Sequence, residues 1–186
     1  MIALIVIIAI VVVMAIIVVV LYNGLVRRRN QVDNAWSQID VQLKRRHDLI
    51  PNLVEAVKDY MSYEQETLTK VTDARAAAVS AGSQGPEAQA HAENALTQSL
   101  RSLFAVAENY PDLKANQNVL SLQEELTTTE NKISFARQFY NDSVMTFNMM
   151  IQQFPSNLLA GMFNFSAREF FQAEEADKEV PKVDLR

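Results

Sequence analysis

The chain has 186 residues, of which 21% are charged, with no cysteine and a formal net charge of −5. The lack of cysteine excludes disulfides, thiol catalysis, Cys-ligated zinc and lipidation on Cys. The acidic balance gives no basis for nucleic-acid binding, which needs a net basic surface.

The first predicted element is a membrane-spanning helix. Residues 2–26 contain no charged side chain and consist almost entirely of Ile, Val, Leu, Ala and Met. A hydrocarbon core about 30 Å thick needs roughly 20 apolar residues in a helix, so this segment can cross a bilayer with some tilt. A cleavable signal peptide would have a basic start and a shorter apolar run, whereas a core helix would have a polar face. We therefore assign residues 1–26 to a transmembrane anchor in contact with the lipid bilayer.

The next residues mark the membrane interface and predict the orientation of the chain. Tyr22 lies at the edge of the apolar segment, and Arg27, Arg28 and Arg29 follow it. Such cations attract anionic lipid headgroups, and they equally serve as a stop-transfer and topology signal. Because positive charges beside a membrane segment favour the cytoplasmic side, we expect the C-terminal domain to be cytoplasmic.

An amphipathic stripe follows the anchor without a strong helix breaker between them. Apolar residues recur at steps of three and four, which is the spacing of one helix face, at Trp36, Ile39, Leu43, Ile50, Leu53 and Val57. The membrane helix should therefore continue into the soluble domain. Arg46 interrupts the stripe, where it either snorkels or pairs with a neighbouring helix. The sharper hypothesis is a buried ion pair that sets the register of the helices.

Pro51 predicts a kink, or a break, in this first helix. Its ring disfavours helical geometry at Ile50, and it has no backbone N–H to donate. Because the stripe resumes on the same face, a kink is favoured over a break. A second arm is expected over residues 52–81, ended by the glycine- and proline-containing turn of residues 80–86.

Two further long helices complete the predicted domain. One covers residues 87–109, and a tight connection at residues 110–116 leads to the longest stripe, from 119 to 154. Pro155 ends that helix. A second apolar face on it predicts that the helix is buried on two sides, and this face consists of Phe135, Phe139, Met145 and Met149.

The elements together predict an all-α fold in which an N-terminal transmembrane helix continues into an antiparallel long-helix bundle. The bundle domain covers residues 27–171 and contains three main helices. The apolar segment of residues 158–171 is expected to pack on the bundle, lie at the membrane surface or contact another copy. Residues 172–186 form a polar tail, which we expect to be partly disordered.

The sequence contains no catalytic, cofactor-binding or metal-binding pattern. The two histidines, His47 and His91, are each expected to be surface or hydrogen-bonded residues rather than bases. Neither histidine has Glu three residues before it, so the di-iron pattern of helical bundles is absent. There is also no phosphate-binding glycine loop, no H-E-x-x-H and no calcium loop. We therefore predict no cofactor and no enzymatic activity.

Several separate motifs of the chain strongly resemble the LemA family of bacterial membrane proteins. They occur in family order at residues 22–26, 29–30, 35–36, 39–46, 48–54, 105–116, 122–126, 129–130, 137 and 140–141. The resemblance implies a membrane anchor on a long-helix bundle, placed in the bacterial inner (plasma) membrane. It also implies no accepted enzymatic activity and, for some members, a part in shaping internal membranes.

Two functions follow as hypotheses. In the first, the protein is a structural homo-oligomer that organises the membrane or scaffolds partners. In the second, it is a signalling or adaptor module that couples the membrane to a soluble partner. Self-association is expected through the membrane helices and the adjoining region, and the candidate interface side chains are Trp36, Ile39, Leu43, Phe163, Phe165, Phe170 and Phe171.

Overall fold

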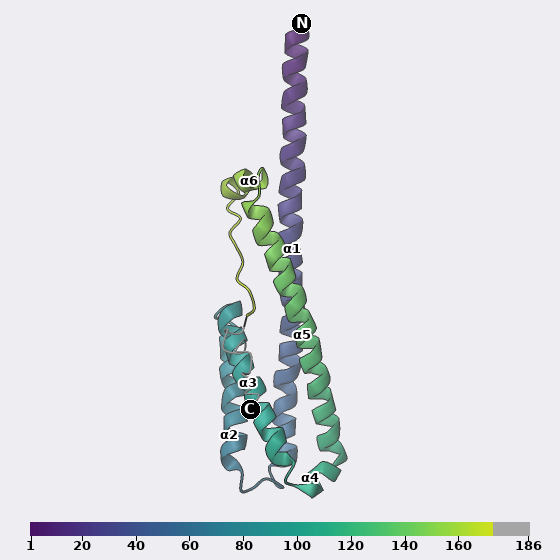
Figure 1. The fold of residues 1–186 in the computed structure, drawn as a ribbon, viewed down its shortest axis with the longest axis vertical. Helices are drawn as coiled ribbons and strands as arrows, with labels where there is room; N and C mark the ends of the chain where they lie inside the picture. The colour runs from purple at the N-terminus through teal and green to yellow at the C-terminus, as the bar shows by residue number, and fades with distance from the viewer. Residues whose placement is uncertain (173–186) are drawn as a thin grey trace, which may run out of the picture. The chain divides into compact units, whose positions relative to one another are not determined.

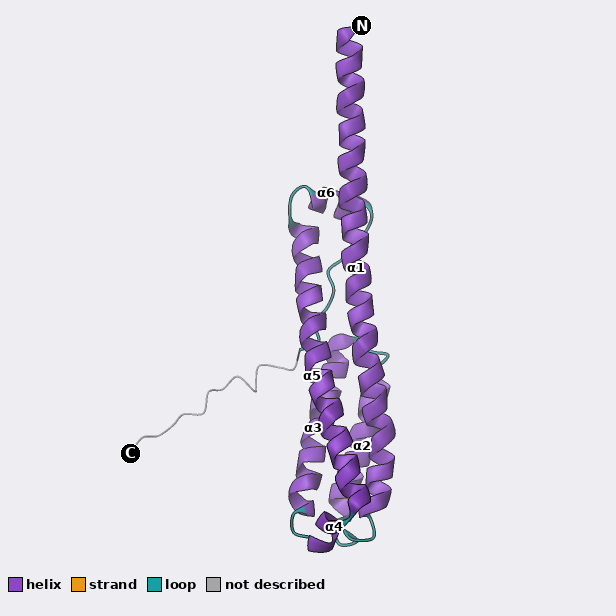
Figure 2. Cartoon of the chain, turned by 90° about the vertical axis from the view of Figure 1, so that its right-hand side faces the viewer, coloured by secondary structure: helices purple, strands orange, loops and turns teal. Residues whose placement is uncertain are grey.

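The regular structure is helical, as the sequence predicts. A computed structural model describes residues 1–172, and within them it contains helices and no strand (Figure 2). The helices are α1 (Ile2–Val57), α2 (Gln65–Ala81), α3 (Pro86–Ala107), α4 (Pro111–Ala115), α5 (Gln117–Gln152) and α6 (Ser156–Met162). The predicted tail of residues 172–186 lies outside the described residues, except for Gln172.

Helix α1 joins the apolar segment to the amphipathic stripe without a break, which confirms the continuous helix predicted from the sequence (Figure 1). It has the length and composition needed to cross a membrane. Residues 1–20 are all exposed. A core helix of a soluble protein would be mostly buried, so the exposure of this apolar run is typical of a membrane segment.

Pro51 does not divide α1, and the break lies further along the chain. The helix continues through Pro51 and ends at Val57, so the predicted arm of residues 52–81 is wrong. Residues 58–64 form turns in which the N–H groups of Tyr60 and Met61 donate to the carbonyl oxygen of Val57. Met61 is fully buried in these turns. No glycine or proline among residues 58–64 indicates this break, and at this point the side chain of Met61 packs into the core.

The chain forms two compact units, to which the long helices α1 and α5 both contribute. The first unit comprises residues 1–39 and 136–168, and the second comprises residues 40–135 and those from 169 onward. In the second unit the apolar stripes of α1, α2, α3 and α5 face one core. This core contains Ile50, Leu53, Val57, Met61, Leu68, Val71, Ala78, Leu96, Leu100, Leu103, Leu113, Val119 and Leu126. Each large aliphatic side chain buried there contributes about 1.5–3 kcal/mol, so hydrophobic burial holds the helices together.

In the first unit, α5 and α6 pack against α1. The rings of Trp36 and Tyr140 have centroids 5.2 Å apart. Nearer the N-terminus of α1, helices α1 and α5 come close at Gly24, where an added Cβ would lie 2.8 Å from Cε of Met150. Helix α6 follows the end of α5 and buries Leu159 and Ala160 together with Leu25 of α1.

The second apolar face of α5 is not buried within one chain. Its four side chains, Phe135, Phe139, Met145 and Met149, are between 43% and 73% exposed. The prediction that α5 is buried on two sides is therefore wrong for the single chain. Only the opposite face, which includes Tyr140, Val144 and Phe147, is buried.

Candidate functional site

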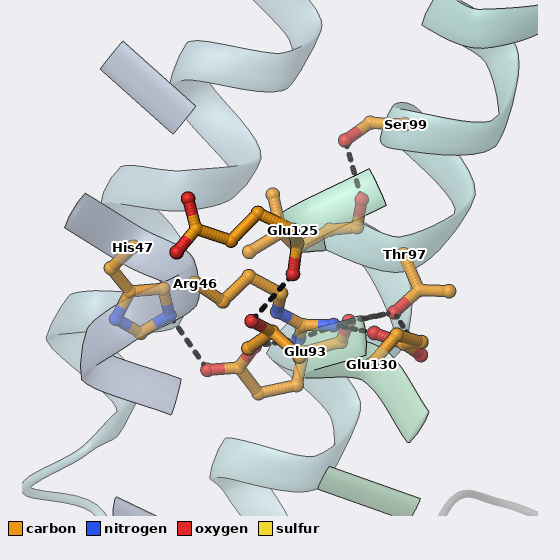
Figure 3. Close-up of polar contacts among 9 residues, drawn as sticks. Arg46, His47, Glu93, Thr97, Ser99, Glu125 and Glu130 are labelled. Atoms are coloured by element: carbon orange, nitrogen blue, oxygen red, sulfur yellow. Dashed lines mark hydrogen bonds and ion pairs between the residues drawn. The ribbon is translucent and has the colours of Figure 1, made fainter. Parts of the chain in front are cut away.

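A buried polar cluster lies between the helices of the second unit. At its centre is Arg46 of α1, a stripe position where an apolar side chain would be expected, and only 1% of it is exposed. Its guanidinium forms ion pairs with Glu93 of α3 and Glu130 of α5 (Figure 3). The same group donates a hydrogen bond of 3.0 Å to Oγ1 of Thr97. The sharper hypothesis for Arg46, a buried ion pair, therefore describes its side chain.

Glu93 is shared between two partners. Its Oε2 atom is paired with Arg46, while its Oε1 atom lies 2.8 Å from Nε2 of His47. His47 is itself buried, so it is a hydrogen-bonded histidine as the sequence predicts. We name the set Arg46, His47, Glu93, Thr97 and Glu130 the Arg46 cluster.

The surroundings of Glu93 keep its carboxylate ionised. Burial alone raises the pKa of Glu93, but the hydrogen bond from His47 and the charge of Arg46 outweigh it and hold this pKa below its usual range. A buried carboxylate and a buried guanidinium are stable only as a pair, because the desolvation free energy of either charge alone would not be offset by an opposite charge.

Pro51 affects the cluster through the helix backbone. In a regular helix the carbonyl of His47 would accept a hydrogen bond from the N–H four residues later, at Pro51, which has none. That carbonyl accepts a hydrogen bond of 2.6 Å from Nε of Arg75 in α2 instead. Pro51 therefore leaves the carbonyl oxygen of His47 without a donor inside α1, and Arg75 of α2 donates to it. With this contact, α1, α2, α3 and α5 all contribute to one polar network.

The chemistry available to the Arg46 cluster is structural. Both oxygens of Glu93 are engaged, one by Arg46 and one by His47. The two terminal nitrogens of Arg46 are paired as well, whereas its Nε is buried without a hydrogen-bond partner. Among the described residues there is no group of three or more His, Cys, Asp or Glu side chains placed to hold a metal ion. A cavity of about 180 Å³ adjoins Arg46, and Thr97, Phe104 and Leu126 are among its lining residues. The arrangement can fix the register of four helices at one level.

The predicted membrane-interface residues lie together in the first unit. Arg27, Arg28 and Arg29 are all exposed. Arg28 donates a hydrogen bond of 3.0 Å to Oε1 of Gln31, and the guanidinium of Arg29 lies 5.2 Å from the ring centroid of Phe165. Arg27 lines an open groove of about 600 Å³ whose other polar residues are Asn23, Asn30, Gln31, Asn34 and Gln38. Exposed cations beside amide groups suit an anionic headgroup, although that contact stays a prediction.

The candidate interface side chains are divided between core and surface. Ile39, Leu43 and Phe171 are buried within the chain itself. Trp36, Phe165 and Phe170 are half-buried, whereas Phe163 is 49% exposed. Of this set, Phe163 therefore offers the largest exposed fraction to another molecule, and the interface as a whole stays a prediction.

Sequence reasoning identified Arg46 but missed its partners. Glu93 lies three residues before Leu96 and Glu130 four residues after Leu126, so both extend apolar stripes with an acidic residue. An acidic residue on the stripe of each of two helices, with an arginine on the stripe of a third, is a signal that could have indicated the cluster. The hydrogen bond from Arg75 carries no such signal, because it goes to a backbone oxygen.

Known proteins match the chain over most of its length. The model of the LemA family matches residues 35–185. The chain is 29% identical to protein LemA of Metamycoplasma hominis, over 88% of this chain and 75% of that protein. It is 26% identical to magnetosome protein MamQ 2 of Paramagnetospirillum magneticum and 24% identical to MamQ of Magnetospirillum gryphiswaldense. Each of these two matches covers 83% of this chain and 66% of the relative.

Proposed function

The chain belongs to the LemA family, and on that premise we propose that it is a non-enzymatic membrane scaffold. In this proposal several copies associate through their anchors and organise the bacterial inner membrane or proteins attached to it. One observation carries the proposal: the exposed apolar run of residues 1–20 belongs to the same unbroken helix that enters the bundle core. Contacts that begin in lipid can therefore continue along the same helix.

The anchor has the dimensions of a single membrane span. Residues 2–21 in a helix extend about 30 Å, which matches the hydrocarbon thickness of a bilayer. Tyr22 then lies at the level of the headgroups, where aromatic side chains are favoured, and Arg27 to Arg29 follow on the aqueous side within reach of the headgroups. By the positive-inside rule, the bundle faces the cytoplasm.

Two features support self-association. The anchor is crowded with β-branched Ile and Val, whose stiff side chains make a ridged surface suited to helix packing. In the first unit, Phe139, Met145 and Met149 also remain exposed on α5. In a monomer this row of apolar side chains would stay exposed to water, whereas an assembly can bury it between copies.

The magnetosome proteins named MamQ give a second, weaker support. By name they are magnetosome proteins, and the match covers 66% of each of them. Together with the shared family, they agree with a membrane-associated helical protein. The Arg46 cluster supports a scaffold over an enzyme, because its charged side chains and His47 are engaged with one another in the part of the chain that the structure describes.

Cysteine cross-linking in native membranes tests the self-association. The chain has no cysteine of its own, so single cysteines can be placed at successive positions from residue 5 to residue 45. A packed interface predicts dimer bands that recur every three to four positions. Ala35→Cys is the matched control, because Ala35 is buried inside one chain and should not cross-link. If no position yields a dimer band, the protein is a monomeric tether and the proposal is wrong.

The adaptor function is the alternative, and the unbroken helix α1 favours it equally. A continuous helix transmits rotation and tilt from the bilayer to the bundle, which a signalling module needs. The two functions differ in copy number. A strict monomer in nanodiscs at high concentration supports the adaptor, whereas particles with several copies support the scaffold.

A further inference from the structure

We infer that α6 and the turn before it form a second membrane-contact element, which inserts its exposed apolar side chains into the bilayer that α1 crosses. The ligand is the headgroup and upper acyl region of the lipids on the side of the bundle. The inference rests on the membrane anchor of the proposed function, and it adds a surface that lies outside the anchor. All residues involved belong to the first unit.

The surface consists of four large apolar side chains within ten residues. We name it the α6 patch, and its members are between 49% and 80% exposed: Phe154, Leu158, Met162 and Phe163. The other side of α6 is buried, because Leu159 and Ala160 pack against Leu25. Single exposed apolar residues are ordinary on protein surfaces, but a group of them on one short element indicates a contact with something apolar.

The level of α6 along α1 identifies the bilayer as that contact. Helix α6 lies beside α1 at Leu21 to Leu25, and the ring of Phe163 has its centroid 4.8 Å from that of Tyr22. The apolar run before this level is about 30 Å long, which is one hydrocarbon thickness. Tyr22 is therefore at the membrane boundary, and α6 is beside it. Figure 1 shows the first part of α1 extending past α6 with no other helix alongside.

The distribution of charge agrees with this placement. Residues 153–167 contain no charged side chain. The first charge after them, Arg168, turns away to Asp33 of α1, with 3.0 Å between Nη2 and Oδ1. Two hydrogen bonds of 2.9 Å between the side chain of Asn148 and the backbone of Arg168 hold the returning segment on α5. Charges are thus absent where α6 would meet acyl chains and present where the chain returns to water.

Lipid suits the patch better than a second copy does, because of continuity with the anchor. The exposed residues 1–20 require an apolar solvent, and the α6 patch adjoins the end of that run. The same bilayer can therefore cover both surfaces with no further partner. The cations Arg27 to Arg29 follow directly on α1 and would meet the headgroups of the same leaflet.

Quenching of a fluorescent probe by lipid tests the insertion. The full chain is reconstituted, so dilute that each vesicle holds a single copy and no second copy covers α5, into vesicles of phosphatidylethanolamine and phosphatidylglycerol that carry a spin label high on the acyl chain. An environment-sensitive fluorophore is attached to Phe154→Cys or Met162→Cys, and Met145→Cys is the matched control. Met145 is also an exposed methionine. It lies about 10 Å before the end of α5 at Gln152, toward the part of α5 where Tyr140 contacts Trp36 and away from the membrane boundary. We expect several-fold stronger quenching at residues 154 and 162 than at 145.

A fourth probe separates this inference from the proposed anchor. Val12→Cys lies in the middle of the apolar run, and if α1 spans the bilayer it must be quenched in matched vesicles whose spin label is placed deep on the acyl chain. In one outcome the probe at residue 12 is quenched, while the probe at residue 162 is quenched no more than that at residue 145. That result overturns the α6 insertion and leaves the anchor intact. No quenching at residue 12 overturns both.

The unsubstituted chain gives an independent check. A charged oxidant that cannot enter the bilayer, peroxymonosulfate, converts accessible methionine to its sulfoxide. In vesicles, Met162 should react several-fold more slowly than Met145, although it is the more exposed of the two in one chain. Equal reaction rates contradict the insertion. Slow oxidation without lipid quenching also contradicts it, because protein rather than lipid then covers the patch.

Discussion

At the scale of single residues, the protein places a charged side chain where its own pattern calls for an apolar one. Arg46 shares a stripe with Leu43 and Ile50, and it is equally buried. A buried ion pair contributes little net stability compared with a hydrophobic contact, but the loss of one partner is costly. The pair therefore acts mainly against wrong arrangements of the helices, in which Arg46 would face no carboxylate.

The first prediction compares Arg46 with its neighbour Arg45. Arg46→Ala leaves Glu93 buried without its cation and should lower the free energy of unfolding by about 3–5 kcal/mol. Arg45→Ala removes an ion pair with Glu125 that joins α1 and α5, but both side chains are more than 40% exposed. Its cost should be about 0–1 kcal/mol. Urea unfolding followed by circular dichroism measures both, and similar losses would show that burial of Arg46 is unimportant.

The second prediction concerns acid. Because the pKa of Glu93 is lower in the folded protein than its ordinary value of 4.5, the folded state binds its proton less tightly than the unfolded state does. Its stabilising contribution is therefore complete above the unfolded pKa and is lost as pH falls through the folded pKa. The urea midpoint should decline below about pH 4.5, and Glu93→Gln should decline less over that window. An identical acid slope in the variant would assign the loss to other groups.

The third prediction tests the coupling between Pro51 and Arg75. Arg75→Met leaves the carbonyl of His47 without a donor and should cost about 1 kcal/mol in the natural chain. In the Pro51→Ala background a backbone N–H again reaches that carbonyl, so the same substitution should cost less. A double-mutant cycle measures the difference. Equal costs in both backgrounds would mean that the proline and the arginine act independently.

At the scale of elements, patterns with strong local signals were predictable and those set by packing were not. The all-α fold, the long α1, the turn before α3 and the end of α5 before Pro155 all follow from periodicity, glycine and proline. The end of α1 at Val57 does not, because no glycine or proline marks residues 58–64. Pro51 predicted a kink or a break, with the kink favoured, and the helix continues through it. A kink at that proline stays a prediction.

The fourth prediction concerns the turn between α2 and α3, where two glycines have different roles. Gly85 has φ of 105°, a conformation that strains any residue with a Cβ. Gly82 has φ of −56°, which other residues adopt easily. Gly85→Ala should therefore destabilise the protein by about 1 kcal/mol or more, while Gly82→Ala, whose Cβ would lie 3.3 Å from the carbonyl oxygen of Val79, should cost less. Thermal unfolding of the two variants compares them, and the reverse order would contradict this account of the turn.

At the scale of the whole molecule, the sequence allowed the membrane anchor and the family to be predicted, but not the polar cluster. A continuous apolar run indicates a helix surrounded by lipid, and an apolar stripe indicates a helix with one face buried in protein. These patterns therefore predict the anchor and the bundle core. An acidic residue on an apolar stripe marks a candidate partner for Arg46, but which carboxylates face it depends on how helices distant in the sequence align, and periodicity within one helix does not show that. The exposed face of α5 was misassigned for the same reason.

The central claim is that several copies associate in the membrane, and counting copies in native bilayer discs tests it most directly. Tyr63→Cys gives a labelling site that is 94% exposed and lies in the turn between α1 and α2. Membranes are cut into discs with a styrene–maleic acid copolymer, and fluorophores are counted by single-molecule photobleaching. The scaffold predicts discs with two or more bleaching steps, at a frequency above that of an unrelated single-pass protein expressed at the same density. Discs that bleach in one step as often as those of the unrelated protein would contradict it.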